Sequence, residues 1–260
     1  MSRPRPLASA ATPERLPPAP GQGLAARLRR RRLALGLRLG APDVLAVIER
    51  VKRERLSYLD RASLVDLALA VRALEREGLE GELIEAGCAL GGSALVMAAA
   101  KAPGRAFAVY DTFETIPPPS AADGADVLER YSEIRDGRAS GIGGDPYYGY
   151  QGDLRPPVAA RFAAFGLPLE ANAVRLIKGL YEDQLHPQGP VALAHIDCDW
   201  YDSVRVCLER IVPWLVPGGR LIFDDYDHWS GGRQAVDDFF RGRDGFRFER
   251  HSRLQVRREA

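Results

Sequence analysis

Two pairs of aspartates follow two short apolar runs in the second half of this 260-residue sequence. Asp197 and Asp199 come after the first run, and Asp224 and Asp225 come after the second. Neighbouring parallel strands end at one edge of a sheet, so we expect the four carboxylates to converge there. Gathered carboxylates repel one another, and a divalent cation such as Mg²⁺ binds oxygen ligands. The spacing therefore predicts a cation site. The alternative is that the first pair caps a helix and the second faces solvent.

One strand–helix–strand unit must position these acids. The two apolar runs, Val191–Ile196 and Arg220–Phe223, are its expected strands. Between them lie a helix-like segment, Ser203–Trp214, and an expected turn, Val216–Gly219. Such a unit is right-handed, with its two parallel strands side by side. This arrangement predicts an α/β fold with the acids at the carboxyl edge of the sheet.

A glycine-rich loop from Glu85 to Ser93 forms a second candidate site. Gly87 lets the backbone turn tightly, and Gly91 allows a ligand or a neighbouring segment to approach the following helix. Asp111 ends the next strand, about 20 residues beyond the loop, where a ribose diol is typically bound. Nicotinamide, flavin and S-adenosylmethionine folds all share this arrangement. Capping of a helix or turn is the alternative role for Asp111.

The remaining chain divides by composition and periodicity. Residues 1–22 are rich in proline and poor in large apolar side chains, which predicts a disordered tail. Residues 23–80 show helical periodicity and are expected to form a helical lid, with plain packing on the sheet as the alternative. The second of these helices is expected to begin at an Asp60 cap and to end at Gly78. Residues 81–260 form the expected core. Within it, the long tyrosine-containing segment 112–157 is expected to bind the acceptor, with a surface loop as the alternative.

Basic and acidic residues nearly balance, with 36 Lys and Arg against 35 Asp and Glu. The balance gives no indication of a nucleic-acid partner or a membrane surface. The three cysteines lack metal-type spacing and fit a reducing compartment. No apolar run reaches the roughly 18 to 20 residues of a membrane span, and no signal-peptide pattern opens the chain. We therefore expect a soluble, cytoplasmic protein.

Five ordered motifs over about residues 51–240 resemble the macrocin O-methyltransferase family. They are Glu85-x-Gly87-x-x-x-Gly91-Gly92-Ser93, Asp111-Thr112-Phe113-Glu114, Lys178-Gly179-x-Tyr181-x-Asp183, His195-Ile196-Asp197-x-Asp199-x-Tyr201-Asp202-Ser203 and Pro217-Gly218-Gly219-x-x-x-Phe223-Asp224-Asp225-Tyr226. The resemblance implies a Rossmann-like class I methyltransferase, with a mainly parallel twisted sheet and helices on both faces. It also implies S-adenosylmethionine and Mg²⁺ as cofactors. The segment from Arg138 to Arg155 departs from the family pattern.

The resemblance assigns roles to individual residues. Three acids match metal ligands: Asp197, Asp224 and Asp225. Asp199 matches a proposed general base. Six residues match cofactor-binding positions: Glu85, Gly87, Gly91, Ser93, Asp111 and, near the adenine, Asp183.

The predicted function is methyl transfer from S-adenosylmethionine to a sugar hydroxyl of a bacterial secondary metabolite, a step of antibiotic biosynthesis. A metal ion stabilises the alkoxide-like oxygen and a carboxylate takes its proton. The predicted partner is a sugar or glycosylated small molecule, and the resemblance implies a homo-oligomer. Three alternatives are a Mg²⁺-dependent catechol or phenol methyltransferase, a nicotinamide-dependent oxidoreductase and a non-catalytic nucleotide-binding module. The pair Asp224-Asp225 favours sugars over phenols, and the loop lacks the Gly-x-Gly-x-x-Gly of nicotinamide enzymes.

Overall fold

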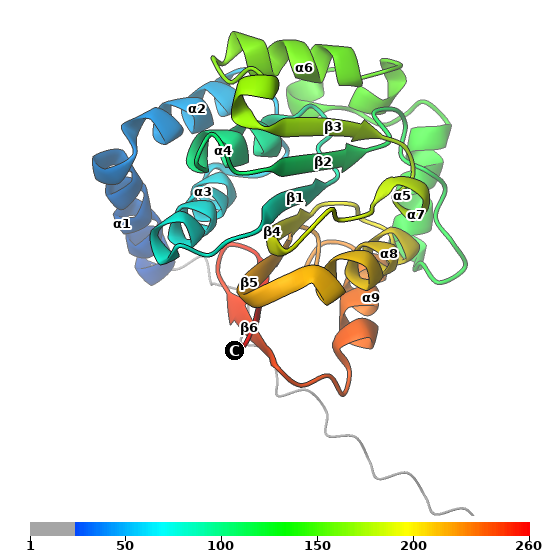
Figure 1. The fold of residues 1–260 in the computed structure, drawn as a ribbon. Helices are drawn as coiled ribbons and strands as arrows, with labels where there is room; N and C mark the ends of the chain where they lie inside the picture. Colours follow the sequence, from blue (N-terminus) through cyan, green and yellow to red (C-terminus); the bar gives the residue numbers. More distant parts are fainter. Residues whose placement is uncertain (1–23) are drawn as a thin grey trace, which may run out of the picture.

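A seven-stranded sheet organises the molecule, in a computed structural model that describes residues 24–260 (Figure 1). The predicted tail, residues 1–22, lies outside the described residues. The strand order is β3-β2-β1-β4-β5-β7-β6. The strands are β1 (Glu82–Ala86), β2 (Phe107–Asp111), β3 (Val174–Lys178), β4 (Val191–Ile196), β5 (Leu215–Phe223), β6 (Phe246–Arg250) and β7 (Leu254–Arg258).

The sheet is mainly parallel. The strands from β3 to β5 run parallel to their neighbours, whereas β7 is antiparallel to both β5 and β6. The paired register sets Glu85 beside His195 and Ile196 beside Phe223. The carboxyl ends of β1, β4 and β5 therefore meet, and the predicted Rossmann-like α/β fold is confirmed.

Helices cover both faces of the sheet, and each face has its own apolar core (Figure 1). One core joins the N-terminal helices and α4 to the strands, and the other joins α8 and α9 to them. The α-helices are α1 (Leu24–Gly40), α2 (Pro42–Arg53), α3 (Arg61–Glu77), α4 (Gly92–Ala100), α5 (Ala125–Arg135), α6 (Arg155–Ala164), α7 (Tyr181–Gln184), α8 (Tyr201–Ile211) and α9 (Ser230–Phe240).

Local chemistry accounts for the ends of α3. The carboxylate of Asp60 accepts a hydrogen bond of 2.7 Å from the backbone N–H of Ser63, which caps the first turn. Gly78 ends the helix with φ of 63°, in the left-handed region that glycine adopts without a steric penalty. The predicted cap at Asp60 and the predicted helix end at Gly78 are both confirmed.

The expected turn at Val216–Gly219 is wrong, because these residues belong to β5. The pairing of β5 with β4 shifts register between Leu215 and Arg220, so the Pro-Gly-Gly sequence forms an irregularity inside the strand. Gly218 takes a φ of 82° there. A β-bulge and a turn use the same residue types, and only the neighbouring strand distinguishes them.

The N-terminal helices are part of the core. Ile48 of α2, Leu64 and Leu74 of α3 and Leu95 of α4 are fully buried in one apolar cluster with Leu83 of β1. This packing matches the alternative given for residues 23–80. The lid role stays a prediction, and it depends on the segment after α2, where Tyr58 reaches the cavity described below.

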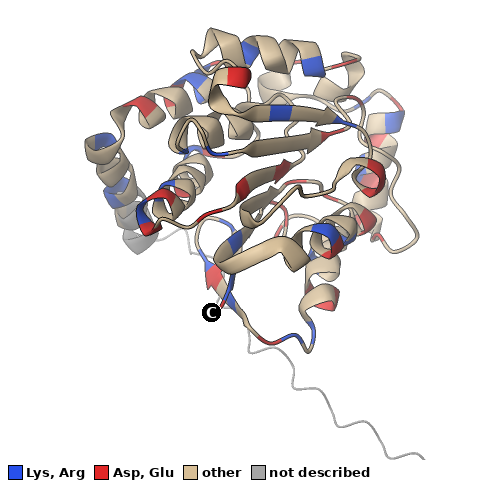
Figure 2. Cartoon of the chain, viewed as in Figure 1, with Lys and Arg blue, Asp and Glu red and all other residues tan. Residues whose placement is uncertain are grey.

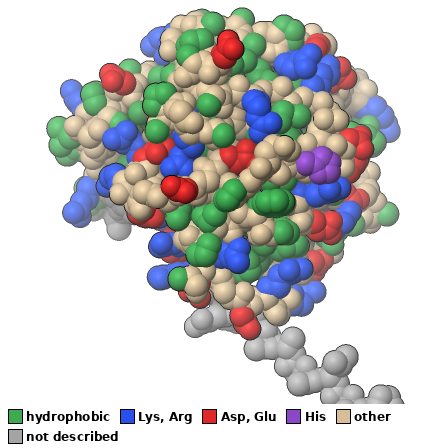
Figure 3. Space-filling view, viewed as in Figure 1, with side chains coloured by type: hydrophobic (Ala, Val, Ile, Leu, Met, Phe, Trp, Pro, Cys, Tyr) green, Lys and Arg blue, Asp and Glu red, His purple; other side chains and the backbone are tan. Residues whose placement is uncertain are grey.

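Charges of both signs are spread over the outer helices (Figure 2), and the face shown in Figure 3 intersperses basic and acidic side chains with small apolar groups. Among the described residues, no helix has both the length and the apolar character needed to cross a membrane.

Candidate active site

The glycine-rich loop passes directly against the end of β4. A Cβ atom on Gly87 would lie 1.8 Å from the backbone oxygen of Asp197, and Gly87 has a φ of 91°. The N–H of Asp197 donates to the Ala86 carbonyl at 2.8 Å. Only glycine fits at this crossing, so Gly87 brings the loop and the first acid together.

Asp111 holds the same loop from the end of β2. Its carboxylate accepts backbone hydrogen bonds from Cys88 at 2.7 Å, Ala89 at 3.0 Å and Phe113 at 2.6 Å. Burial raises the pKa of Asp111, and the three N–H donors oppose that shift. The contacts match the turn-capping alternative, and Asp111 also lines the cavity, where a ribose would be bound.

Gly91 and Ser93 lie at the start of α4, behind the cavity rather than in its wall. A Cβ on Gly91 would lie 2.9 Å from Cγ1 of Val158 in α6, and one on Gly92 would lie 2.3 Å from the Leu56 carbonyl oxygen. The close approach predicted for these glycines is therefore made by neighbouring segments of the chain.

Glu85 is fully buried beneath the loop and pairs with His195 across β1 and β4. Nδ1 of His195 lies 2.9 Å from Oε1 of Glu85, while Glu85 Oε2 and His195 Nε2 have no hydrogen-bond partner among the described residues. Burial alone lowers the pKa of His195, but the hydrogen bond and charge of Glu85 raise it overall. The sequence predicts that His195 lies in the strand Val191–Ile196, but it does not indicate that Glu85 is the hydrogen-bond partner of His195.

A cavity of about 690 Å³ opens at the carboxyl edge of the sheet. It is lined by both the loop and the acids, and by aromatic side chains from five separate segments. Its wall includes Gly87, Ala89, Asp111, Thr112, Tyr58, Tyr147, Tyr148, Tyr181, Asp197, Asp199, Trp200, Asp224, Asp225, His228, Trp229 and Arg253.

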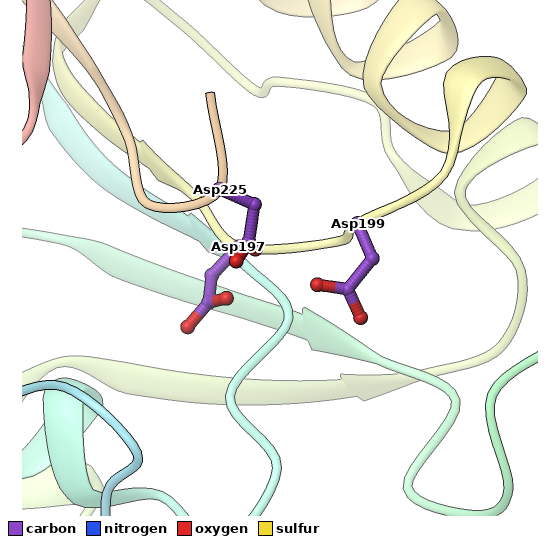
Figure 4. A group of neighbouring side chains, drawn as sticks. All are labelled: Asp197, Asp199 and Asp225. Carbon is purple, nitrogen blue, oxygen red and sulfur yellow. The ribbon is translucent and has the colours of Figure 1, made fainter. Parts of the chain in front are cut away.

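Three of the four predicted acids come together in this cavity. Asp197, Asp199 and Asp225 each offer an oxygen atom within 4.8 Å of the others. Asp197 and Asp199 come from the segment after β4 and Asp225 from the segment after β5 (Figure 4). The prediction that two strand ends converge is confirmed for these three residues.

Electrostatic strain marks this cluster. Burial and then the charge of Asp224 raise the pKa of Asp197, and burial and then the charges of Asp199 and Asp197 raise that of Asp225. Burial also raises the pKa of Asp199, whose backbone has a left-handed φ of 57°. Oδ2 of Asp225 is buried and has no hydrogen-bond partner among the described residues.

Asp224 faces a different partner. Its Oδ1 accepts a hydrogen bond of 2.6 Å from Nε of Arg253, and both residues line the cavity. Arg253 lies at the start of β7, where Leu254 pairs with Phe223 of β5. Arg253 is a cavity residue that the sequence does not predict, because nothing in the sequence shows that β7 lies next to β5.

Asp183 is exposed on the short helix α7 and does not line the cavity. Tyr181, two residues earlier, does. The structure therefore places Tyr181, rather than Asp183, beside the space available to a nucleoside.

The donor set fits a hard divalent cation. All the gathered atoms are carboxylate oxygens, and an unpaired buried oxygen points to a missing positive partner. The adjoining loop, with its required glycine and buried acid, leaves room for a nucleoside-type cofactor in the same cavity.

The insert between β2 and β3 supplies another wall of the cavity. It contributes Ile116, Pro117, Arg130, Glu133, Ile134, Tyr147 and Tyr148. Two of its carboxylates hold it in place: Asp123 accepts from the N–H of Tyr201 at 2.8 Å, and Asp126 accepts from the N–H of Ser230 at 2.9 Å. The insert is thus fixed to the first residues of α8 and α9.

Comparison with known proteins agrees with this arrangement. The model of a family described as macrocin-O-methyltransferase (TylF) matches residues 53–141 and 151–246. A protein of Streptomyces olivaceus, 8-demethyl-8-(2,3-dimethoxy-alpha-L-rhamnosyl)-tetracenomycin-C 4'-O-methyltransferase, is 35% identical over 186 residues. The alignment covers 69% of this chain, and the chain spans 65% of that relative's length.

Two solved structures share the fold. The O-methyltransferase NovP has a TM-score of 0.65 at 20% identity, over 79% of this chain and 83% of NovP. CalS11, a calicheamicin methyltransferase, has a TM-score of 0.52 at 22% identity, over 92% of this chain and 95% of CalS11.

The family model spans the glycine-rich loop and both aspartate pairs, and it passes over residues 142–150. All five motifs that carried the resemblance lie within the matched ranges. The chain belongs to the macrocin O-methyltransferase family.

Proposed function

We propose that this protein transfers a methyl group from S-adenosylmethionine to a sugar hydroxyl of a bacterial secondary metabolite. The observation that supports this most directly is the cluster of Asp197, Asp199 and Asp225 in the same cavity as the Gly87 loop. Family membership supplies the reaction class. The name of the Streptomyces relative describes a 4'-O-methyltransferase of a rhamnosylated tetracenomycin, which suggests a sugar-bearing small molecule as acceptor.

The charges of the cavity favour an uncharged acceptor. Its two arginines are already paired, Arg130 with Glu133 at 2.9 Å and Arg253 with Asp224 at 2.6 Å. Among the described residues, the cavity wall therefore offers no unpaired arginine or lysine to bind a phosphate group. A sugar carried on an uncharged natural product suits this wall better than a free sugar phosphate.

The proposed metal is Mg²⁺, held by Asp197 and Asp225. The resemblance implies Asp224 as the third ligand, which requires its carboxylate to be shared with, or released by, Arg253. When bound, the cation would stabilise the negative charge that develops on the acceptor hydroxyl. The protein itself binds and orients the acceptor between the acids and the aromatic wall. Gly87 and Asp111 are proposed to bind the donor, with Glu85, Gly91 and Ser93 supporting the loop from behind.

Asp199 is the proposed general base. Its carboxylate lies in the cluster, and burial raises its pKa, which makes it a better proton acceptor near neutral pH. It lies close enough to Asp197 and Asp225 to be a metal ligand instead. Substitution of Asp199 should lower the affinity for Mg²⁺ if Asp199 is a metal ligand, and should leave that affinity unchanged if Asp199 is only the general base.

The Asp199→Asn variant separates these roles. As the base, Asp199 contributes about 10²- to 10⁴-fold to turnover, so the variant should lose that much activity. Its affinities for Mg²⁺ and S-adenosylhomocysteine, measured by calorimetry, should stay close to those of the wild type. A large loss of Mg²⁺ affinity would make Asp199 a ligand, and unchanged turnover would remove the base role.

The first experiment is titration of S-adenosylhomocysteine into the purified protein, with Mg²⁺ and with a chelator. Micromolar or tighter binding is the expected result. Activity is then compared between rhamnosides and catechols, because a Mg²⁺-dependent phenol methyltransferase shares the metal chemistry. If S-adenosylhomocysteine does not bind under either condition, the proposed function fails, and nicotinamide cofactors are tested next.

Three further expectations belong to this proposal. We expect the protein in the cytoplasm, a reducing compartment in which its three buried, free cysteines would keep their thiols. It is expected to self-associate, and a solution mass equal to one chain would contradict that. The segment after α2 is proposed to act as the lid, through Tyr58.

A further inference from the structure

Residues 142–150, over which the family model passes, form part of the cavity wall. Tyr147 and Tyr148 line the cavity from this segment, and Tyr147 is only 3% exposed. Their ring centroids are 4.5 Å apart. Tyr58, which also lines the cavity, meets Tyr148 edge-on with centroids 6.1 Å apart.

The segment is held firmly in place. The hydroxyl of Tyr150 donates to the Ile134 carbonyl at 2.7 Å and accepts from the N–H of Ala139 at 3.2 Å. A Cβ atom on Gly149 would lie 2.7 Å from Cε1 of Tyr147, so glycine is required for this packing. The tyrosines are therefore presented by an anchored loop rather than by a free one.

The two tyrosines share the cavity with the acid cluster. Burial is the main cause that raises the pKa of both Tyr147 and Tyr148, and the charge of Asp199 adds a smaller contribution to each. At neutral pH both phenols keep their protons and can donate hydrogen bonds. A sugar ring offers C–H faces that pack on aromatic rings and hydroxyl edges that accept from phenols.

We infer that Tyr148, supported by Tyr147, contacts the acceptor sugar and selects which hydroxyl reaches Asp199. This inference rests on the proposed function. It assigns acceptor selectivity to the part of the insert that the family model does not match. On this inference, a change in residues 142–150 would alter acceptor selectivity and leave the acids unchanged.

The test compares Tyr148→Phe, Tyr148→Ala and Tyr147→Phe with Tyr131→Phe. The control removes a hydroxyl from α5 of the same insert, at a residue outside the cavity wall. The probes are methyl α-L-rhamnopyranoside and its 4-nitrophenyl counterpart. The measurements are the acceptor KM, kcat, the methylated position by NMR and the dissociation constant of S-adenosylhomocysteine.

Tyr148→Phe should raise the acceptor KM roughly 3- to 10-fold, the effect of losing one hydrogen bond. Tyr148→Ala should raise it further and give a mixture of methylated positions. Affinity for S-adenosylhomocysteine and the melting temperature of Tyr148→Phe should match those of Tyr131→Phe.

Two results would overturn the inference while leaving the proposed function intact. One is an acceptor KM and methylated position unchanged in all three cavity variants. The other is an equal KM increase in Tyr131→Phe. Failure of the wild type to bind S-adenosylhomocysteine would instead reject the proposed function and this inference together.

Discussion

At the scale of single residues, the acid cluster stores unfavourable electrostatic energy when no cation is present. The pKa of Asp225 is raised well above its usual range, by burial and then by Asp199 and Asp197. The folded chain therefore binds more protons than the unfolded chain above a pH of about 4, the usual range of an aspartate. The free energy of unfolding therefore falls as pH rises from the aspartate pKa of the unfolded chain to the raised pKa of Asp225 in the folded chain. Over that range the folded chain holds a proton that the unfolded chain has already released.

Asp225→Asn should therefore stabilise the cation-free protein at pH 7. Each kcal/mol relieved should raise the melting temperature by about 2–4 °C in a chain of this size. The gain should shrink towards pH 4, where the wild-type carboxyl is protonated too. Thermal unfolding in chelator at both pH values measures this. An equal or larger gain at pH 4 would contradict the electrostatic origin and indicate a packing effect.

Some of these site residues can be predicted from the sequence, and others cannot. The convergence of Asp197 and Asp225 followed from the rule that parallel strands end together. Arg253 could not be predicted, because its position beside Asp224 depends on β7 pairing with β5, and α9 and β6 separate these two strands in the chain. The placement of Asp183 outside the cavity depends on the course of a short helix, which periodicity does not resolve.

At the scale of elements, the insert provides caps for helices that lack their own. No side chain of the preceding residue caps α8 or α9. Asp123 and Asp126 of the insert accept hydrogen bonds from Tyr201 and Ser230 instead. The insert and the two helices are therefore coupled, although they are far apart in the sequence.

Asp126→Ala should loosen this attachment. Loss of a helix cap costs about 1 kcal/mol, and the insert should become more sensitive to limited proteolysis. The hydrogen bond to Ser230 lowers the pKa of Asp126, so its contribution is present at neutral pH and is lost as pH falls through the lowered pKa. Asp136→Ala, an exposed acid at the other end of α5, is the control. Equal protease sensitivity in both variants would argue against the capping role.

Elements were predictable where their ends carry local signals. Asp60 and Gly78 marked α3 because their side-chain and backbone preferences act within one turn. The Pro-Gly-Gly sequence in β5 led to the wrong prediction of a turn, because the backbone conformations that proline and glycine favour occur both in turns and in strand irregularities. The pairing partner decides between them, and that partner is distant in sequence.

At the scale of the whole molecule, the N-terminal helices and the sheet share one apolar core. Leu74 of α3 is fully buried in the same cluster as Leu95 of α4 and Leu83 of β1. The described chain should therefore unfold as one cooperative unit, rather than lose its N-terminal helices first.

Leu74→Ala should lower the free energy of unfolding by about 2–5 kcal/mol, the usual cost of a large-to-small substitution in a core. All three tryptophans, Trp200, Trp214 and Trp229, lie in the C-terminal half. Their fluorescence and the far-UV circular dichroism should shift together on denaturation. Separate transitions for the two signals would show that the N-terminal helices form an independent unit.

The strand order also has a consequence for synthesis on the ribosome. β7 is the last strand in sequence, yet it lies between β5 and β6 in the sheet. Until it emerges, β5 has an unpaired edge, which is a site for unwanted strand pairing. Asp224 also has no arginine beside it during that interval. The nascent chain thus carries its acids before the arginine that balances them, and the emergence of β7 completes both the pairing of β5 and the site.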